Sequence, residues 1–187
     1  MITFLITIRG VVLSQKSLIG ENAMNRNLLI LGAGGHGHVV KETAEALNIF
    51  DDIDFLDDQS PEAIGRCVDL IEYTDSYTFA IPAFGNNELR NKWQTELLKV
   101  GFTIPVLIHP ASFVSPSAEL EAGTVVLAHA VVNTNVKIKA GVIIGIGALI
   151  DHDTIVEKFS HINSGAIIKA GMEVEMFSKI NAGTIFG

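Results

Sequence analysis

Residues 123–150 read GTVVLAHAVVNTNVKIKAGVIIGIGALI, and a large aliphatic side chain recurs in this stretch at every sixth position. The same spacing continues in both directions without an insertion. The positions are Ile108, Val114, Leu120, Val126, Val132, Ile138, Ile144, Ile150, Val156, Ile162, Ile168, Val174, Ile180 and Phe186. Neither a helical period nor a strictly alternating one describes this pattern, so we interpret residues 108–187 as a repeat of six-residue units.

Two further positions in each unit are regular. Small residues predominate two positions before each large one, as at Ala130 and Ala148, and glycine recurs three positions after it, as at Gly147 and Gly165. A hexapeptide repeat of this kind is typical of a parallel β-helix. Each unit forms one flat side and a turn, three sides close an 18-residue coil, and coils stack at about 4.8 Å. Residues 18 apart in sequence should therefore lie above one another.

The first half of the chain follows a different pattern. An apolar run at residues 28–31 meets a glycine cluster, and apolar residues then recur at helical spacing through Leu47. Gly32, Gly34 and Gly37 match G-x-G-x-x-G, a turn in which backbone N–H groups approach a phosphate at a helix N-terminus. The alternative is that these glycines only form a tight strand-to-helix turn.

A second apolar segment ends at Asp57 and Asp58, where a carboxylate can hold a ribose or a base. Two more strands are predicted at residues 77–82 and 105–108, with a helix between them. These elements predict a four-stranded parallel sheet over residues 26–108. Because this unit is too small for the usual dinucleotide fold, we expect a mononucleotide or a nucleotide-sugar as its ligand. We do not expect the protein to be a nicotinamide oxidoreductase.

Composition limits the partners. A net charge of -8 with only 13 Lys and Arg residues argues against nucleic-acid binding. The single cysteine, Cys67, excludes a disulfide framework and fits a reducing cytoplasm. There is no apolar run of membrane-spanning length, so we expect no membrane insertion. Residues 1–25 are predicted to be a disordered extension, with Met24 as the more natural start.

A histidine between two aspartates follows inward-pointing Ile150. In the predicted coil, His152 and its neighbours project from a corner, while His161 faces outward from the next side. A neutral imidazole can accept a proton at neutral pH, and a carboxylate on its other nitrogen fixes the tautomer. Asp153 is our choice for that carboxylate and Asp151 is the alternative. A solvent-exposed His–Asp pair without a catalytic role also remains open.

Five segments together resemble a known family. They are LLILGAGGHGHVV (28–40), FLDDQ (55–59), GNNELRNKW (85–93), LIHPASFVSPSAEL (107–120) and IDHDTIVEKFSHINSGA (150–166). In this order they resemble the left-handed β-helix sugar O- and N-acetyltransferases, which join an N-terminal nucleotide-sugar-binding βαβ domain to a hexapeptide domain. The resemblance covers residues 26–187. It implies domains at 26–107 and 108–187, acetyl-CoA as acetyl donor, and a homotrimer with the acetyl-CoA cleft between neighbouring prisms.

The resemblance also implies roles for individual residues. His152 would be the catalytic base with Asp153 beside it, His161 would contact the acetyl group or thioester, and backbone N–H groups near Ala170 and Gly171 would stabilise the oxyanion. The nucleotide end of the sugar would be held by the residues Gly32, Gly34, Gly35, His36, Gly37, Asp57, Asp58 and Asn87. His36 and His38 have no third ligand nearby, so we expect no metal site.

The resemblance leaves three functions to distinguish. The first is N-acetylation of a UDP- or GDP-linked amino-sugar, as in the bacillosamine-pathway enzymes. The second is O-acetylation of a sialic acid or of another sugar hydroxyl. The third is a catalytically silent trimeric binding or scaffold protein. Members of the family are expected to continue for several further hexapeptides, whereas this chain stops at INAGTIFG (180–187). A solenoid without a terminal cap exposes unpaired backbone groups.

Overall fold

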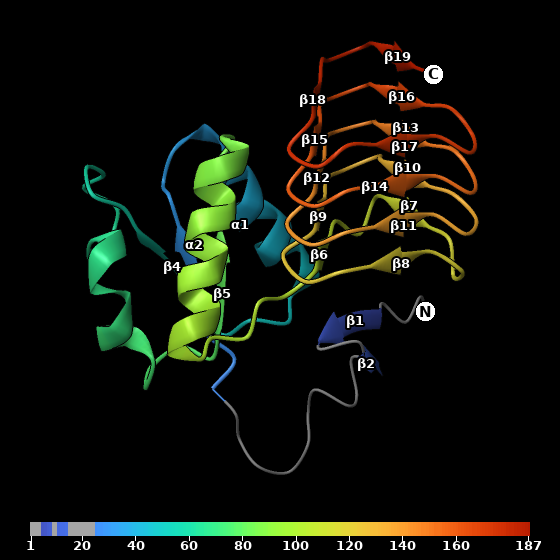
Figure 1. Ribbon diagram of the computed structural model, residues 1–187. Helices are drawn as coiled ribbons and strands as arrows, with labels where there is room; N and C mark the ends of the chain where they lie inside the picture. Colours follow the sequence, from blue (N-terminus) through green and yellow to red (C-terminus); the bar gives the residue numbers. More distant parts are fainter. Residues whose placement is uncertain (1–4, 9–10, 15–24) are drawn as a thin grey trace.

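An α/β unit lies beside a triangular stack of coils in the computed structural model, which describes residues 5–8, 11–14 and 25–187 (Figure 1). Strands β1 (Leu5–Ile8) and β2 (Val11–Ser14) pair antiparallel. The rest of the expected extension up to residue 24 lies outside the described residues, so its disorder stays a prediction. The α/β unit contains β3 (Leu28–Leu31), α1 (Gly35–Leu47), β4 (Ile53–Leu56), the 3₁₀-helix η1 (Cys67–Tyr73), β5 (Phe79–Pro82) and α2 (Asn87–Val100).

The sheet of the α/β unit is parallel, in the order β4-β3-β5. All four residues of the central strand β3 are buried, as its unbroken apolar run predicts. Helix α1 buries Val40, Ala44 and Leu47 at helical spacing, and α2 ends at Gly101, whose positive φ of 102° suits glycine. Among the described residues, no helix is both long and apolar enough to cross a lipid bilayer.

The predicted fourth strand of this sheet is wrong. Residues 107–108 form β6, and β6 pairs with β9 of the coil stack through bonds such as Leu107 N–H to the Thr124 carbonyl, 3.0 Å. Within the described part of the chain, a single bridge between Phe79 and Thr103 continues the α/β sheet at that edge. The physical reason is the repeat itself, because Leu107 already has a partner one coil further along the chain. The stack therefore begins one residue before Ile108.

Three parallel sheets form the sides of the coil stack. The first sheet contains β6 (Leu107–Ile108), β9 (Val125–Val126), β12 (Ile143–Ile144), β15 (His161–Ile162) and β18 (Lys179–Ile180). The second contains β7 (Phe113–Val114), β10 (Val131–Val132), β13 (Leu149–Ile150), β16 (Ile167–Ile168) and β19 (Ile185–Phe186). The third contains β8 (Glu119–Leu120), β11 (Lys137–Ile138), β14 (Ile155–Val156) and β17 (Glu173–Val174).

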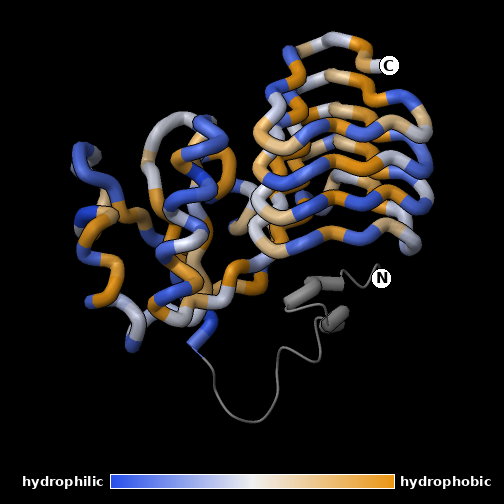
Figure 2. The backbone as a smooth tube through the Cα atoms, viewed as in Figure 1, coloured by the Kyte–Doolittle hydropathy of each residue, from blue (hydrophilic) through white to orange (hydrophobic). Residues whose placement is uncertain are grey.

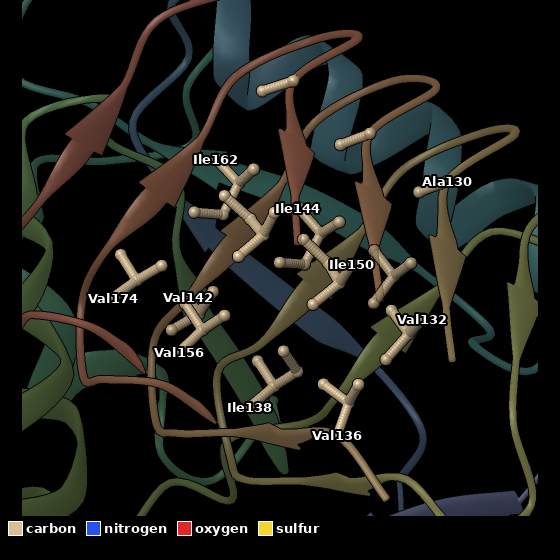
Figure 3. Close-up of a cluster of buried hydrophobic side chains, with 14 residues drawn as sticks. Ala130, Val132, Val136, Ile138, Val142, Ile144, Ile150, Val156, Ile162 and Val174 are labelled. Carbon is tan, nitrogen blue, oxygen red and sulfur yellow. The ribbon is translucent and has the colours of Figure 1, made fainter. Parts of the chain in front are cut away.

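The core of the stack confirms the period of six. All fourteen predicted inward positions belong to one hydrophobic cluster, and those from Val126 to Val174 are buried (Figure 3). Residues 18 apart pair directly, as Val132 with Ile150 and Ile150 with Ile168. Hydrophobic and hydrophilic stretches consequently repeat along each coil (Figure 2). Burial of these aliphatic side chains holds the coils together, while the corners are free to carry polar residues.

Helix α2 runs along the stack and joins the two units at one corner (Figure 1). Arg90 is 1% exposed, and its guanidinium donates to the carbonyls of Phe84, Gly141 and Phe159 at 2.8 Å each. Gln94, one turn further along α2, donates to the Ala122 carbonyl at 3.2 Å. Successive turns of α2 thus hold successive coils, which fixes the α/β unit against the stack.

Replacing Arg90 should loosen this attachment. We expect Arg90→Ala to lower the free energy of unfolding by about 3–5 kcal/mol, because it leaves buried carbonyls unpaired and opens a cavity. Arg66→Ala is the control, since Arg66 is exposed and pairs with Asp69 three residues away, and it should cost less than about 1 kcal/mol. Denaturant titration measures both, and equal losses would contradict this role of Arg90.

Candidate functional site

His152 lies at the corner between β13 and β14, as the repeat predicts. Its Nδ1 is 2.8 Å from Oδ2 of Asp153, and its side chain is 54% exposed. Asp151 instead accepts the backbone N–H of His152 at 2.8 Å. Of the two aspartates that the sequence left open, Asp153 is the one on the imidazole in this structure. With Nδ1 bound to a carboxylate, Nε2 is the nitrogen that can accept a proton.

The charges at this corner favour the protonated imidazole. The hydrogen bond with Asp153 raises the pKa of His152 above its ordinary value, and the negative charges of Asp151 and Asp153 act in the same direction. The hydrogen bonds from His152 and then Asn135 lower the pKa of Asp153, so this carboxylate is ionised at neutral pH. The pair therefore stabilises the imidazolium that forms when His152 takes up a proton.

Ala170 and Gly171 lie one coil beyond His152, as predicted. The Gly171 N–H donates to the His152 carbonyl at 3.0 Å, so that group is already used within the stack. The Ala170 N–H has no backbone acceptor among the described residues. Of the two predicted oxyanion donors, only Ala170 has an N–H that is not already used in a bond between the described coils.

A shallow groove runs beside Asp153 on the third sheet. Its volume is about 420 Å³, and it is lined by Ser117, Glu119, Asn135, Lys137, Asp153 and Ile155. The lining residues come from three stacked coils, so the groove runs along the prism from coil to coil. A long, flexible ligand can lie in such a groove with one end at the His152–Asp153 pair.

His161 points outward from β15, as predicted, but it faces the α/β unit. Its ring lies 6.3 Å from that of His36, centroid to centroid. The first sheet, which carries His161, faces the α/β unit, whereas the corner with His152 lies on the far side of the prism (Figure 1). A single chain therefore does not bring His161 and His152 together around one acetyl group.

His36 and His161 are largely buried and neutral. Burial lowers the pKa of both to about 4, and the positive charge of Arg90 acts in the same direction. Among the described residues, His36 Nε2 and His161 Nδ1 are buried without a hydrogen-bond partner. Unpaired polar atoms on two neighbouring rings are unusual in a protein interior and mark a place where a ligand or water can bind.

The glycine cluster divides into structural and open positions. A Cβ at Gly37 would lie 2.0 Å from the Gly32 carbonyl oxygen, and one at Gly32 would lie 2.9 Å from the Phe84 ring. At Gly34 and Gly35 no described atom lies within 4 Å of a Cβ. Gly34 caps α1 without a side-chain hydrogen bond, so the first N–H groups of α1 remain open to an anion.

The polar side chains predicted to hold the nucleotide are engaged elsewhere. Asp57 accepts the N–H groups of Ala33, Gln59 and Ser60 at 2.8–2.9 Å, and these bonds lower its pKa. Asp58 accepts the Cys67 N–H at 3.0 Å. Asp57 thus fastens the glycine turn, and Asp58 fastens the start of η1.

Asn87 also serves the packing of the two units. Its amide donates to the carbonyls of Phe177, at 2.7 Å, and Ser178, and its oxygen accepts a bond from Arg90. Sequence reasoning missed Arg90, which gives no sign of burial in an amphipathic helix. It also missed Asn135, although the 18-residue spacing from Asp153 could have revealed that residue.

The fold defines a class of protein. A glycine-turn α/β unit joined to a hexapeptide β-solenoid is the arrangement of a hexapeptide-repeat acyltransferase. A family model described as the PglD N-terminal domain matches residues 27–97.

Solved structures extend the match to both units. The acetyltransferase domain of PglB from Neisseria gonorrhoeae, in complex with acetyl coenzyme A, is 38% identical, with a TM-score of 0.84 over 87% of this chain and 82% of that one. PerB from Caulobacter crescentus, in complex with CoA and GDP-perosamine, shares the fold at 22% identity, with a TM-score of 0.72 over 86% and 88% of the two chains. The chain belongs to the family of left-handed β-helix sugar acetyltransferases.

The buried histidines predict a specific loss of stability in acid. Their pKa in the folded state is about 4, against 6.5 for the ordinary side chain. The unfolded chain therefore binds more protons between these values, and stability falls as the pH drops from 6.5 to 4, by at most about 3 kcal/mol per histidine. Above pH 6.5 the two histidines contribute no pH dependence.

Denaturation curves at several pH values check this. His36→Asn and His161→Asn should each flatten the decline in stability below pH 6.5 relative to the parent. If the parent and both variants lose stability in parallel, the histidines are not the groups that titrate.

Proposed function

We propose that the protein transfers the acetyl group of acetyl-CoA to an amino group of a nucleotide-linked amino-sugar, with His152 as general base. The observation that carries the proposal is the 2.8 Å contact between His152 Nδ1 and Asp153 at an exposed corner. Membership of the sugar acetyltransferase family supports the reaction class, and the acetyl-CoA complex of the PglB domain, at 38% identity, supports the donor.

The chemistry requires one base. His152 Nε2 takes a proton from the sugar amine as the amine nitrogen attacks the thioester carbonyl carbon of acetyl-CoA. The C–S bond then breaks, and the imidazolium returns the proton to the CoA thiolate, so the products are the acetamido-sugar and free CoA. Asp153 holds the tautomer and stabilises the imidazolium. A positioned base of this kind contributes about 10²–10⁴-fold to the rate.

The oxyanion that forms at the thioester carbonyl needs a donor nearby. The Ala170 N–H, one coil beyond His152, is the group we assign to it, because the Gly171 N–H is already bonded to the His152 carbonyl. The Gly171 N–H is not assigned as a second donor, because using it would break a bond between coils.

The acceptor is held at the α/β unit. Gly34 and Gly35 allow a phosphate to approach the open N-terminus of α1. His36 Nε2 and His161 Nδ1 lie nearby and have no partner among the described residues, and both rings are uncharged at neutral pH. They can therefore form hydrogen bonds with sugar hydroxyls or phosphate oxygens. This arrangement supports a nucleotide-sugar in preference to a free sugar.

We infer that the working enzyme is a homotrimer, because the base and the acceptor pocket lie on opposite sides of one chain. A neighbouring copy can supply the missing half. The outward residues of the second sheet form an apolar column of Phe113, Val131, Leu149, Ile167 and Ile185, of which Phe113, Leu149 and Ile185 are 55%, 40% and 64% exposed. This column borders the corner that carries His152, and a continuous row of exposed apolar side chains suits contact with another copy of the chain.

Removing the base tests the mechanism. We expect His152→Ala to abolish acetyl transfer from acetyl-CoA to UDP- and GDP-linked amino-sugars, measured with a thiol reagent, while nucleotide-sugar binding by calorimetry stays nearly unchanged. Asp153→Asn should lose much more activity than Asp151→Asn, because only Asp153 contacts the imidazole.

Several outcomes would change the assignment. Comparable rates in His152→Ala and the parent would refute the base. Acetylation of hydroxyl acceptors but not amines would favour the sugar O-acetyltransferase. Nucleotide-sugar binding without release of thiol would favour the silent binding protein.

A single charged substitution tests whether the apolar column is the interface between copies. Leu149→Lys places an ammonium in the middle of the column and should convert a trimer into monomers by light scattering, with loss of acetyl transfer. Leu98→Lys is the matched control, because Leu98 is an exposed leucine of α2, 55% exposed. If both variants keep the mass of the parent, the column is not the interface.

A further inference from the structure

Two amide–carboxylate pairs flank His152. Asn135 Nδ2 donates to Asp153 Oδ1 at 3.1 Å, and Asn133 Nδ2 donates to Asp151 Oδ1 at 3.0 Å. In each pair the residues are 18 apart, so each asparagine lies one coil before its aspartate. The corner thus holds two parallel side-chain ladders, one on each side of the histidine.

The two ladders end on different parts of His152. The carboxylate of Asp153 bonds the imidazole Nδ1, whereas that of Asp151 bonds the backbone N–H. Only the ladder from Asn135 therefore reaches the ring. Asn133 has the same chemistry and nearly the same bond length, but it acts on the backbone.

Asn135 is itself held in place by the coil before it. Its backbone N–H donates to Ser117 Oγ at 3.0 Å, and Ser117 Oγ lies 3.1 Å from the hydroxyl of buried Ser115. The chain of contacts from Ser115 to the imidazole spans three coils. A side chain at the open corner is in this way tied to the interior of the stack.

The backbone conformation explains why the pair can form. Asn135 and Asp153 both have φ of 58°, a left-handed conformation that glycine adopts at the same place one coil later, at Gly171. Asn and Asp are the side-chain-bearing residues that tolerate this conformation best. Because both residues share it, their side chains leave the corner in the same direction and meet.

We propose that Asn135 is a positioning residue, which holds the Asp153 carboxylate so that its second oxygen stays on His152 Nδ1. Asp153 is more than half exposed, and without this bond its carboxylate is free to rotate away from the ring. The proposal rests on the proposed function only in taking His152 as the base. The geometry of the ladder stands without it.

Replacing Asn135 with glycine changes no charge near His152. The charged groups facing the ring are Asp151 and Asp153, and Glu119 and Lys137 line the groove beside them. Asn135 lies among these groups as a neutral donor. A change in the titration of His152 on its removal therefore reports the loss of the hydrogen bond.

The test compares Asn135→Gly with Asn133→Ala. Glycine removes the amide without straining the left-handed backbone. We expect Asn135→Gly to lower kcat by about 10- to 100-fold with little change in KM for acetyl-CoA, because a misplaced base costs rate and not binding. The acid limb of the pH–rate profile should move to lower pH, since Asp153 then raises the pKa of His152 less. Asn133→Ala should leave that limb in place.

An isosteric variant guards against misfolding as the cause. Asn135→Asp keeps the shape and the tolerance for the backbone, but it replaces the donor with a carboxylate that repels Asp153. Its loss of kcat should equal or exceed that of Asn135→Gly, while thermal melting shows both variants folded. If Asn135→Gly matches the parent in kcat and pH profile, or if Asn133→Ala loses as much, the proposal is overturned.

Side-chain NMR separates this proposal from the proposed function. The pKa of His152, followed through its ring ¹⁵N resonances, should fall in Asn135→Gly and not in Asn133→Ala, whether or not any acceptor is acetylated. If the parent transfers no acetyl group and this shift is seen, the proposed function fails and the positioning role holds. An unchanged His152 pKa in Asn135→Gly overturns the positioning role, whatever the activity of the parent.

Discussion

The structure depends on the stacking of each residue on the residue 18 positions away. Inside the prism this register places aliphatic side chains in contact from coil to coil, and the burial of those side chains provides most of the favourable free energy. A shift by one residue would turn the whole aliphatic set outward, so the register is strongly fixed. Because the core needs only the inward positions, the corners can carry glycine, asparagine or the His152–Asp153 pair without cost to the packing.

The same register organises the polar groups. At the corner with His152 it places Asn135 under Asp153 and Asn133 under Asp151. At another corner, Arg90 of α2 bonds the carbonyls of Gly141 and Phe159, which are 18 residues apart and lie on successive coils. Gln94, one turn further along α2, bonds the Ala122 carbonyl on the coil before them. A helix rises about 5.4 Å per turn and coils are about 4.8 Å apart, so the two repeats match closely over a few turns. The attachment of the α/β unit is thus a consequence of the stack.

Much of this could be predicted from sequence because a period is a property of many residues. The fourteen inward positions, the corner position of His152 and the outward direction of His161 follow from counting by six. It was harder to predict the contacts of Asp57, Asp58 and Asn87, because a polar side chain at the end of a strand or the start of a helix can bind either a ligand or a nearby backbone group. In this fold all three side chains bond backbone groups, and their contact with a nucleotide stays a prediction. The partner of His161 was also hidden, because nothing in the repeat tells which side of the prism the α/β unit covers.

The position of that unit shapes how the site must work. His36 and His161 lie where the α/β unit meets the first sheet, and His152 lies on the corner most remote from it (Figure 1). The stack cannot bend to close this distance, because every coil is bonded to the next through its backbone and α2 bonds to several coils at once. Domain closure within one chain is therefore a poor way to bring acceptor and base together. Association of copies needs no internal motion. The proposed base and the proposed acceptor site lie on opposite sides of a rigid prism, so each copy can give its neighbour what that neighbour lacks. The apolar column beside the His152 corner is where the burial of surface can drive that association.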